Sequence, residues 1–197
     1  MKILFICLGN ICRSCTAEEI FRTLAHAQPD LKNHYNVDSA GIIDYHQGEL
    51  PDSRMRAHAR KHGYELTHHS RPIVPEDFHK FNLIVAMDNR NYDKLLRMAS
   101  AEGVDTGMVV KMADYLQHHP TYDTIPDPYY GTDRDFELVI ELLEDACQNM
   151  LEELETSRYF VLLKRACISL KVRNKFRTYL IQNSTSVYRN SWKYWLR

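Results

Sequence analysis

The chain has 197 residues, of which 44% are hydrophobic and 26% are charged, a composition typical of a globular protein with one substantial core. Because no run of 18 apolar residues occurs, we expect no membrane-spanning helix. The apolar N-terminus is too short for a signal peptide and breaks at Gly9 and Asn10, so we expect a cytoplasmic protein.

The net charge of −1 conceals an uneven distribution along the chain. Residues 1–156 hold 15 basic residues and all 26 acidic ones, a net charge of −11, whereas residues 157–197 hold ten basic residues and no acidic one. Such a change of sign marks a boundary. We therefore expect one folded domain over residues 1–156, a basic extension over residues 157–197, and no nucleic-acid partner.

Apolar runs alternate with amphipathic stretches along the first 155 residues. The expected strands are residues 2–7, 35–39, 82–87 and 108–112, and the expected helices are residues 16–27, 53–62, 89–100 and 134–155. This alternation predicts an α/β fold with a doubly wound, four-stranded parallel sheet flanked by helices. Because ligands bind at the carboxyl ends of such strands, the turn after residue 7 and the loop of residues 114–132 should lie at one edge.

The most informative segment joins the first strand to the first helix and consists of Cys7, Leu8, Gly9, Asn10, Ile11, Cys12, Arg13 and Ser14. A loop in this position can direct backbone N–H groups inward, next to the positive end of a helix, and so bind an anion. Gly9 and Asn10 tolerate left-handed backbone angles, and Arg13 can bind two phosphate oxygens. These surroundings favour the thiolate of Cys7, which can attack phosphorus and form a phosphocysteine.

A phosphoester leaving group needs a proton, so an acid is expected at the same edge of the sheet. The late loop and the start of the helix after it offer Asp123, Asp127, Asp133 and Asp135. Asp127 is the best candidate, because Pro128 restricts its backbone and the pair Tyr129-Tyr130 can form a wall for an aromatic ring. A Pro-containing turn with tyrosines packed on the sheet explains these residues equally well.

The cysteines number five and are Cys7, Cys12, Cys15, Cys147 and Cys167. Their odd number, without a secretion signal, favours thiol chemistry over a disulfide framework. A zinc site is the weaker interpretation, because the three clustered cysteines have no second pair of ligands at metal spacing. We therefore expect no metal and no cofactor.

Five motifs together resemble the low-molecular-weight protein tyrosine phosphatase family over roughly residues 1–155. They are Cys7 to Ser14, Asp38-Ser39-Ala40-Gly41, Pro51-Asp52-Ser53-Arg54, Ala86-Met87-Asp88 and Asp127-Pro128-Tyr129-Tyr130. The resemblance implies a flavodoxin-like sheet. It also implies hydrolysis of tyrosine phosphate in phosphotyrosine-containing proteins through a phosphocysteine intermediate.

The resemblance also implies roles for single residues. Cys7 would be the nucleophile, Arg13 the phosphate-binding residue, and Asp127 the general acid and then the general base. The supporting residues are Ser14 for the thiolate and Asn10, Ser39 and His68 for the loop. The substrate pocket would be formed by Tyr45, Tyr129 and Tyr130.

Two further cysteines bear on the resemblance. Cys12 matches a family cysteine that pairs with the nucleophile under oxidation, which implies redox regulation. Cys15 departs from the family, which usually has Pro at this position; the loss of Pro would loosen the end of the loop slightly. Cys15 also adds a third thiol that can compete for a disulfide with Cys7 or Cys12.

Three alternative activities stay open. Arsenate reductases of the family need two more cysteines near mid-chain, and none occurs between Cys15 and Cys147. Arginine phosphatases of the family carry Thr where this chain has Ile11, and the apolar side chain favours an aromatic leaving group. A catalytically silent phosphate-binding module would normally have lost Cys7, Arg13 or Asp127.

Residues 157–197 lie outside the resemblance. They contain the apolar clusters Tyr159–Leu163 and Ala166–Leu170 and, near the end, Trp192 and Trp195. We rank an uncommitted extension first and docking onto the acidic domain second. Binding to an anionic membrane surface through the basic and aromatic residues ranks third.

Overall fold

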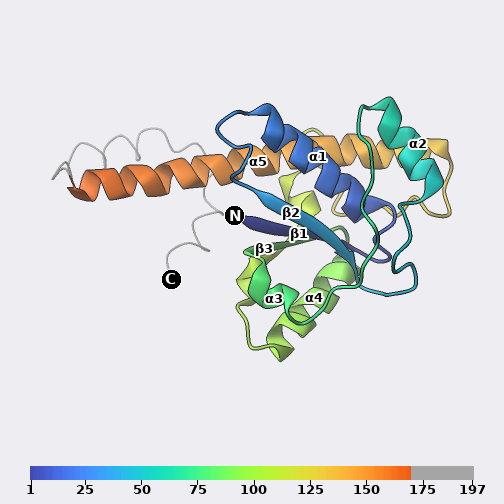
Figure 1. Ribbon diagram of the computed structural model, residues 1–197, viewed down its shortest axis with the longest axis horizontal. Helices are drawn as coiled ribbons and strands as arrows, with labels where there is room; N and C mark the ends of the chain where they lie inside the picture. Colours follow the sequence, from blue (N-terminus) through green and yellow to red (C-terminus); the bar gives the residue numbers. More distant parts are fainter. Residues whose placement is uncertain (170–197) are drawn as a thin grey trace. The chain divides into compact units, whose positions relative to one another are not determined.

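The computed structural model describes residues 1–169, and within them it confirms the predicted α/β architecture (Figure 1). Four parallel strands are hydrogen-bonded in the order β2-β1-β3-β4, as in flavodoxin-like folds. The strands are β1 (Lys2–Cys7), β2 (Asn36–Gly41), β3 (Leu83–Ala86) and β4 (Val109–Lys111). The α-helices are α1 (Arg13–Ala27), α2 (Ser53–Lys61), α3 (Asp77–Lys80), α4 (Asn89–Ala101) and α5 (Asp133–Ser169), and the 3-10 helices are η1 (Thr106–Met108) and η2 (Met112–Tyr115).

The central strand β1 is buried on both faces, which explains its continuous apolar sequence. On one face Phe5 packs against Phe21 of α1, with ring centroids 5.9 Å apart. On the other face Leu4 and Ile6 belong to a core cluster with residues of α3 and α4. Figure 1 shows the same layers, with α1 and the part of α5 up to Leu151 on one side of the sheet and α3 and α4 on the other.

The register of the sheet places the carboxyl ends of its strands at one edge. Cys7 at the end of β1 pairs with Gly41 at the end of β2, and Ala86 at the end of β3 pairs with Lys111 at the end of β4. The loop after β4 returns to this edge, since the N–H of Ile125 donates to the carbonyl of Met87 over 2.8 Å. The predicted meeting of the two loops at one edge is confirmed.

Several element boundaries differ from the sequence-based prediction. Helix α1 begins at Arg13 rather than at residue 16, because the last residues of the loop after β1 already form its first turn. The four-residue helix α3 was not predicted. The predicted end of the last helix at residue 155 is wrong, because α5 continues to Ser169 through a segment that contains neither Gly nor Pro.

The chain divides into two compact units, Met1–Leu151 and Glu152–Arg197. The boundary expected after residue 156 falls inside α5, five residues beyond this division. Residues 170–197, with Trp192 and Trp195, lie outside the described residues, so the proposed contacts of the extension stay predictions.

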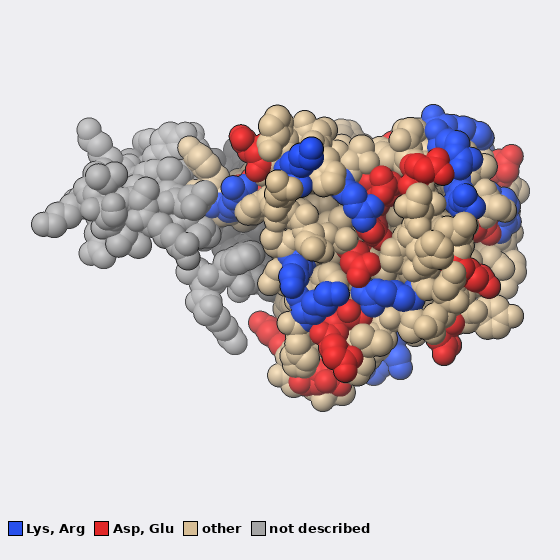
Figure 2. Space-filling view, viewed as in Figure 1, with Lys and Arg blue, Asp and Glu red and all other residues tan. Residues whose placement is uncertain are grey.

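The described surface carries charges of both signs. Figure 2 shows acidic and basic side chains interspersed over the face that it displays. Within residues 1–169, no helix combines the length and the apolar composition that crossing a membrane requires.

Candidate active site

The phosphate loop, defined here as residues Cys7–Ser14, joins β1 to α1 at the carboxyl edge of the sheet. Asn10 has a φ of 58°, so the predicted left-handed conformation is confirmed at this residue. Gly9 does not have a positive φ, so the loop does not use its tolerance of left-handed angles. A Cβ atom at Gly9 would instead lie 3.0 Å from Cδ2 of His46, so the absence of a side chain lets His46 pack on the loop.

The buried thiol of Cys7 is in contact with two hydrogen-bonding groups of the loop. The backbone N–H of Asn10 donates to its Sγ over 3.2 Å, and Oγ of Ser14 lies 3.1 Å from the same sulfur. Burial, with a further contribution from negative charge at Cys7, raises the pKa of both Cys12 and Cys15. The raised pKa values keep these two thiols protonated at neutral pH. Cys7 is the candidate nucleophile because its sulfur contacts the N–H and hydroxyl groups of the loop.

The side chain of Asn10 holds the phosphate loop to the rest of the domain. Its Nδ2 donates to Oγ of Ser14 and to Oγ of Ser39, each over 2.9 Å. Its Oδ1 accepts from Nε2 of His68 and from the backbone N–H of Arg71, each over 3.0 Å. The structure thus brings together the supporting residues that the resemblance implied.

Glu18 is a functional residue that the sequence reasoning missed. Its Oε2 accepts from Oγ of Ser39 over 2.7 Å and lies 3.1 Å from Nδ1 of His68, and Oε1 pairs with Arg22. Burial opposes ionisation, but the contacts with His68, Ser39 and Arg22 outweigh it and hold the pKa of Glu18 below its usual value. Glu18 therefore supports, from inside the core, the residues that contact Asn10.

Glu18, His68 and Asp38 also form the one group within residues 1–169 that has the spacing of metal ligands. Each already has a protein partner outside the group, since Asp38 pairs with Arg71 over 2.8 Å, Glu18 pairs with Arg22, and His68 contacts Asn10 over 3.0 Å. The contacts fit an ion-pair network that orients His68.

Arg13 is buried and faces two carboxylates. Its Nη1 donates to Oδ2 of Asp88 over 2.7 Å and to the carbonyl of Ile125 over 3.2 Å, and its Nη2 donates to Oδ2 of Asp127 over 2.6 Å. Burial would lower the pKa of Arg13, but negative charge at Cys7, Asp127 and Asp88 raises it. Its Nε is buried and has no hydrogen-bond partner, which leaves one donor for an anion beside Cys7.

Asp88 has two functions in the structure. Its Oδ1 accepts from the backbone N–H of Asn91 over 2.7 Å and so caps α4. Its Oδ2 binds Arg13, as described above. One carboxylate therefore fixes both the start of a helix and the orientation of the guanidinium.

Asp127 lies in the loop before α5, and its side chain is 42% exposed. Its Oδ1 accepts from the backbone N–H of Tyr129 over 3.1 Å, while Oδ2 faces Arg13. We call the segment Asp127–Tyr130 the acid loop. The structure thus places the predicted acid beside the predicted phosphate-binding residue.

The aromatic residues form a row along the rim of the site. The ring of His46 lies 5.0 Å from that of Tyr45 and 6.4 Å from that of Tyr129, whose ring in turn lies 4.9 Å from that of Tyr130. Tyr129 is partly buried, whereas Tyr45 is 81% exposed and Tyr130 is 96% exposed. His46 was missed by the sequence reasoning, and its position next to Gly9 makes it part of this rim.

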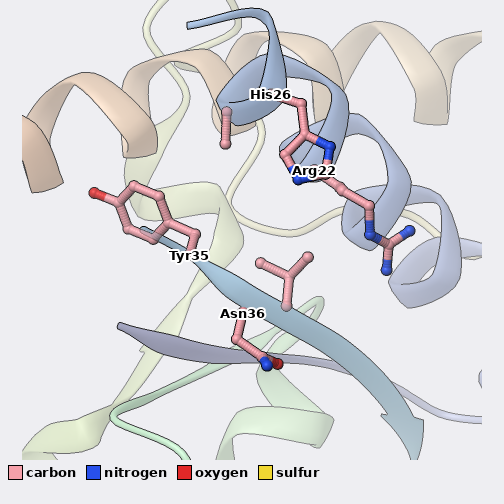
Figure 3. A pocket seen from close by; sticks show the side chains of 6 residues that line it. Arg22, His26, Tyr35 and Asn36 are labelled. Carbon is pink, nitrogen blue, oxygen red and sulfur yellow. The ribbon is translucent and has the colours of Figure 1, made fainter. Parts of the chain in front are cut away.

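A separate depression of about 230 Å³ lies at the opposite edge of the sheet (Figure 3). It is lined by residues of α1, by Tyr35 and by the first residues of β2, among them Arg22, His26 and Asn36. Asn36 pairs with Lys2, at the amino end of β1, whereas Cys7 lies at the carboxyl end. This depression is therefore not part of the candidate active site.

Comparisons with known proteins agree with this geometry. The family model described as "Low molecular weight phosphotyrosine protein phosphatase" matches residues 2–159. A Synechocystis relative with the name of this family is 45% identical over 154 residues, which cover 78% of this chain and 96% of the relative.

Solved structures lead to the same family. A protein tyrosine phosphatase from Entamoeba histolytica is similar with a TM-score of 0.74 and 41% identity, covering 80% of this chain and 99% of its own. A Drosophila arginine phosphatase is similar with a TM-score of 0.72 and 31% identity, covering 78% and 98%. The fold and the site define a phosphatase of the flavodoxin-like class with a cysteine in its phosphate loop. The chain belongs to the low molecular weight phosphotyrosine protein phosphatase family.

Proposed function

We propose that this chain hydrolyses phosphotyrosine in proteins through a phosphocysteine formed at Cys7. The observation that carries the proposal is the convergence of three groups from separate segments. The Cys7 sulfur lies at the base of the phosphate loop, the buried Arg13 closes that loop, and the Asp127 carboxylate lies 2.6 Å from the guanidinium. A nucleophile, an anion-binding group and an acid are the parts that phosphoester hydrolysis requires.

Phosphate binding would rearrange the contacts of Arg13. Its unpaired Nε would gain a phosphate oxygen as acceptor, and its planar guanidinium could bind a second oxygen through Nη2. Nη2 donates to the carboxylate of Asp127 in this structure, so a phosphate oxygen bound to Nη2 would displace that carboxylate. Asp88 would keep its contact with Nη1 and hold the guanidinium in plane.

The chemical steps follow from this arrangement. The thiolate of Cys7 attacks phosphorus, the bond from phosphorus to the phenolic oxygen breaks, and Asp127 gives its proton to that oxygen. In the second step Asp127 takes a proton from water, whose oxygen attacks the phosphocysteine. The sulfur–phosphorus bond breaks, inorganic phosphate forms, and the thiolate of Cys7 is regenerated with its contacts to Asn10 and Ser14.

The rim supports tyrosine as the substrate residue. His46 lies next to Gly9 of the phosphate loop, and the rings of Tyr45 and Tyr129 lie beside His46, so these aromatic side chains could contact a phenyl ring bound there. Ile11 adds an apolar side chain within the loop itself.

Phosphoarginine is the second candidate substrate, and the similarity to the Drosophila arginine phosphatase favours it. A guanidinium leaving group would meet the carboxylates of Asp127 and Asp88 at the same site. The comparison of two phosphopeptides that differ only in the phosphorylated residue decides between the substrates.

The test is an initial-rate assay with phosphotyrosine, phosphoarginine and phosphoserine peptides, in the presence of a metal chelator. We expect phosphotyrosine to give the highest kcat/KM, and Cys7→Ser to abolish turnover while retaining phosphate binding. We expect Asp127→Asn to reduce the rate on phosphotyrosine by roughly 10²–10⁴, the usual contribution of a general acid. A fully active Cys7→Ser variant, or a wild-type chain inert toward all three peptides, would refute the proposal.

Oxidation of the site is a further part of the proposal. Cys7 and Cys12 are both buried in the phosphate loop, and a disulfide between them would block attack on phosphorus while protecting Cys7 from irreversible oxidation. The cytoplasmic location expected from the sequence stays a prediction.

A further inference from the structure

Arg54, near the start of α2, lies outside the phosphate loop and the acid loop but contacts residues next to both. Its guanidinium pairs with the carboxylate of Asp52 through two bonds, Nε to Oδ1 over 3.1 Å and Nη2 to Oδ2 over 2.8 Å. Asp52 is also the N-cap of α2, where Oδ1 accepts from the backbone N–H groups of Arg54 and Met55. The guanidinium is therefore held in one orientation although its side chain is 43% exposed.

The same guanidinium reaches the acid loop. Its Nη2 donates to the carbonyl of Tyr129 over 3.0 Å, and its central carbon lies 5.5 Å from the ring centre of Tyr129 and 4.8 Å from that of Phe136. Tyr129 is the residue whose N–H donates to Oδ1 of Asp127. Arg54 thus holds the carbonyl of Tyr129 in place, and Tyr129 is itself hydrogen-bonded to Asp127, the predicted general acid.

These contacts complete a closed path between the two loops. The N–H of Asp52 donates to the carbonyl of Ile11 in the phosphate loop over 2.8 Å. The path then runs from Asp52 through Arg54 and Tyr129 to Asp127. The bond from Asp127 to Arg13 returns it to the phosphate loop.

The proposed phosphate binding would open this path at one point. A phosphate that takes Nη2 of Arg13 would remove the short contact that holds Oδ2 of Asp127. Upstream, Ile125 is bound to Met87 and to Nη1 of Arg13. Downstream, the contact that still joins the acid loop to α2 is that of Arg54 with Tyr129.

We propose that Arg54 is a positioning residue that keeps Asp127 oriented for proton transfer while Arg13 binds the phosphate. The inference rests on the proposed function, because it concerns the acid of that reaction. Arg54 need not contact the reacting atoms, since it acts through the backbone of Tyr129. A small displacement of a catalytic group costs up to about 10² in rate, so the loss of this contact should be measurable.

The test measures kcat/KM on aryl phosphates whose phenols differ in acidity, from p-nitrophenyl phosphate to phenyl phosphate and a phosphotyrosine peptide. A nitrophenolate leaves without a proton, whereas phenolate and tyrosine depend on the acid. We expect Arg54→Met to lower kcat/KM by roughly 10–10² on phenyl phosphate and phosphotyrosine, and by less than about threefold on p-nitrophenyl phosphate. Arg54→Lys keeps the positive charge but not the bidentate pair with Asp52, so its losses in kcat/KM on phenyl phosphate and phosphotyrosine should lie between those of wild type and Arg54→Met.

Arg60→Met is the matched control. Arg60 lies on the same helix and pairs with Glu65 through two bonds of 2.9 and 2.8 Å, away from the acid loop. The Arg60→Met variant should keep the wild-type kcat/KM on every aryl phosphate of the series. In an Asp127→Asn background, Arg54→Met should cause no further loss on phenyl phosphate, because the group that it positions is absent.

An equal loss on all leaving groups, or full additivity with Asp127→Asn, would overturn the inference. If Arg54→Met does not fold, Arg54→Lys supplies the same comparison. A wild-type enzyme without activity on any aryl phosphate would instead refute the proposed function itself.

Discussion

Replacement of Asn10 separates two contributions to the shape of the phosphate loop. Its side chain makes four hydrogen bonds, to Ser14, Ser39, His68 and Arg71, and its backbone is left-handed. Asn10→Gly removes the hydrogen bonds but tolerates the backbone angle. At a net value of roughly 0.5–1.5 kcal/mol for each bond, we expect the free energy of unfolding to fall by about 2–6 kcal/mol.

Asn10→Ala loses the same hydrogen bonds and, like the wild-type residue, keeps a Cβ atom at positive φ, whereas Asn10→Gly removes that atom. Relief of this strain is worth roughly 1–2 kcal/mol, so the alanine variant should be the less stable of the two. Urea denaturation followed by fluorescence measures both values, with the slope against urea as a check that the unfolded state is unchanged. The exposed Asn89 provides the control, because its side chain makes only long contacts, of 3.3 Å to Asp123 and 3.5 Å to Lys111. Asn89→Ala should change stability by less than about 0.5 kcal/mol. Equal stability of Asn10→Gly and Asn10→Ala, or a loss below about 1 kcal/mol in both, would refute the reasoning.

Three other changes test the surroundings of the site. Arg13→Lys should lower kcat/KM on phosphotyrosine by roughly 10²–10³ at unchanged thermal stability, because an ammonium cannot replace the planar guanidinium on Asp88 and the phosphate; a loss below tenfold would contradict this. Glu18→Gln should lower the free energy of unfolding by about 1–3 kcal/mol in urea, because it weakens the contacts with Ser39 and His68; no loss would mean that the carboxylate is not needed. Glu137 of α5 pairs with His58 and Lys61 of α2 and with His62, which follows that helix, and these pairs should make the stabilising effect of Glu137 depend on pH. The contacts raise the pKa of His62, so its contribution is complete below about 6.5 and is lost as the pH rises through the raised value. The histidines lower the pKa of Glu137 to about 2, so its contribution is present above about 4.5 and is lost as the pH falls toward 2. The difference in Tm between wild type and Glu137→Gln should therefore be largest near pH 5–6, and a difference that is constant from pH 4 to 9 would contradict the assignment.

The phosphate loop could be predicted from the sequence because its parts are contiguous. A buried strand, a short segment with Gly9 and Asn10, an arginine and a helix together define the position of an anion, and Asn10 has the predicted left-handed backbone. The order of elements also predicted the parallel sheet, and the sheet then places Asp127 at the same edge as Cys7. What the pattern determined was therefore the order of elements and the edge at which they meet.

The partners of the site residues could not be predicted in this way. Arg13 and Asp88 are 75 residues apart, as are Arg54 and Tyr129, and Glu18 meets Ser39 across 21 residues. Each of these polar residues has an ordinary local explanation as a helix cap, a first-turn acid or an exposed charge. Their contacts depend on side-chain directions at the crossing of loops and helices, which hydrophobic periodicity does not encode.

The end of α5 shows a different kind of error, in the length of an element. The predicted helix over residues 134–155 is too short, because α5 passes residue 156, where the chain changes from acidic to basic, and ends at Ser169. A helix stops where the backbone loses its hydrogen bonds, at Gly, Pro or a capping residue, and the segment from 134 to 169 has neither Gly nor Pro. Net charge acts on association and solubility rather than on the backbone, so a change in its sign carries no information about where a helix ends. The more informative observation was local: the Leu, Glu, Lys and Arg of residues 151–165 favour continued helix, whatever their net charge.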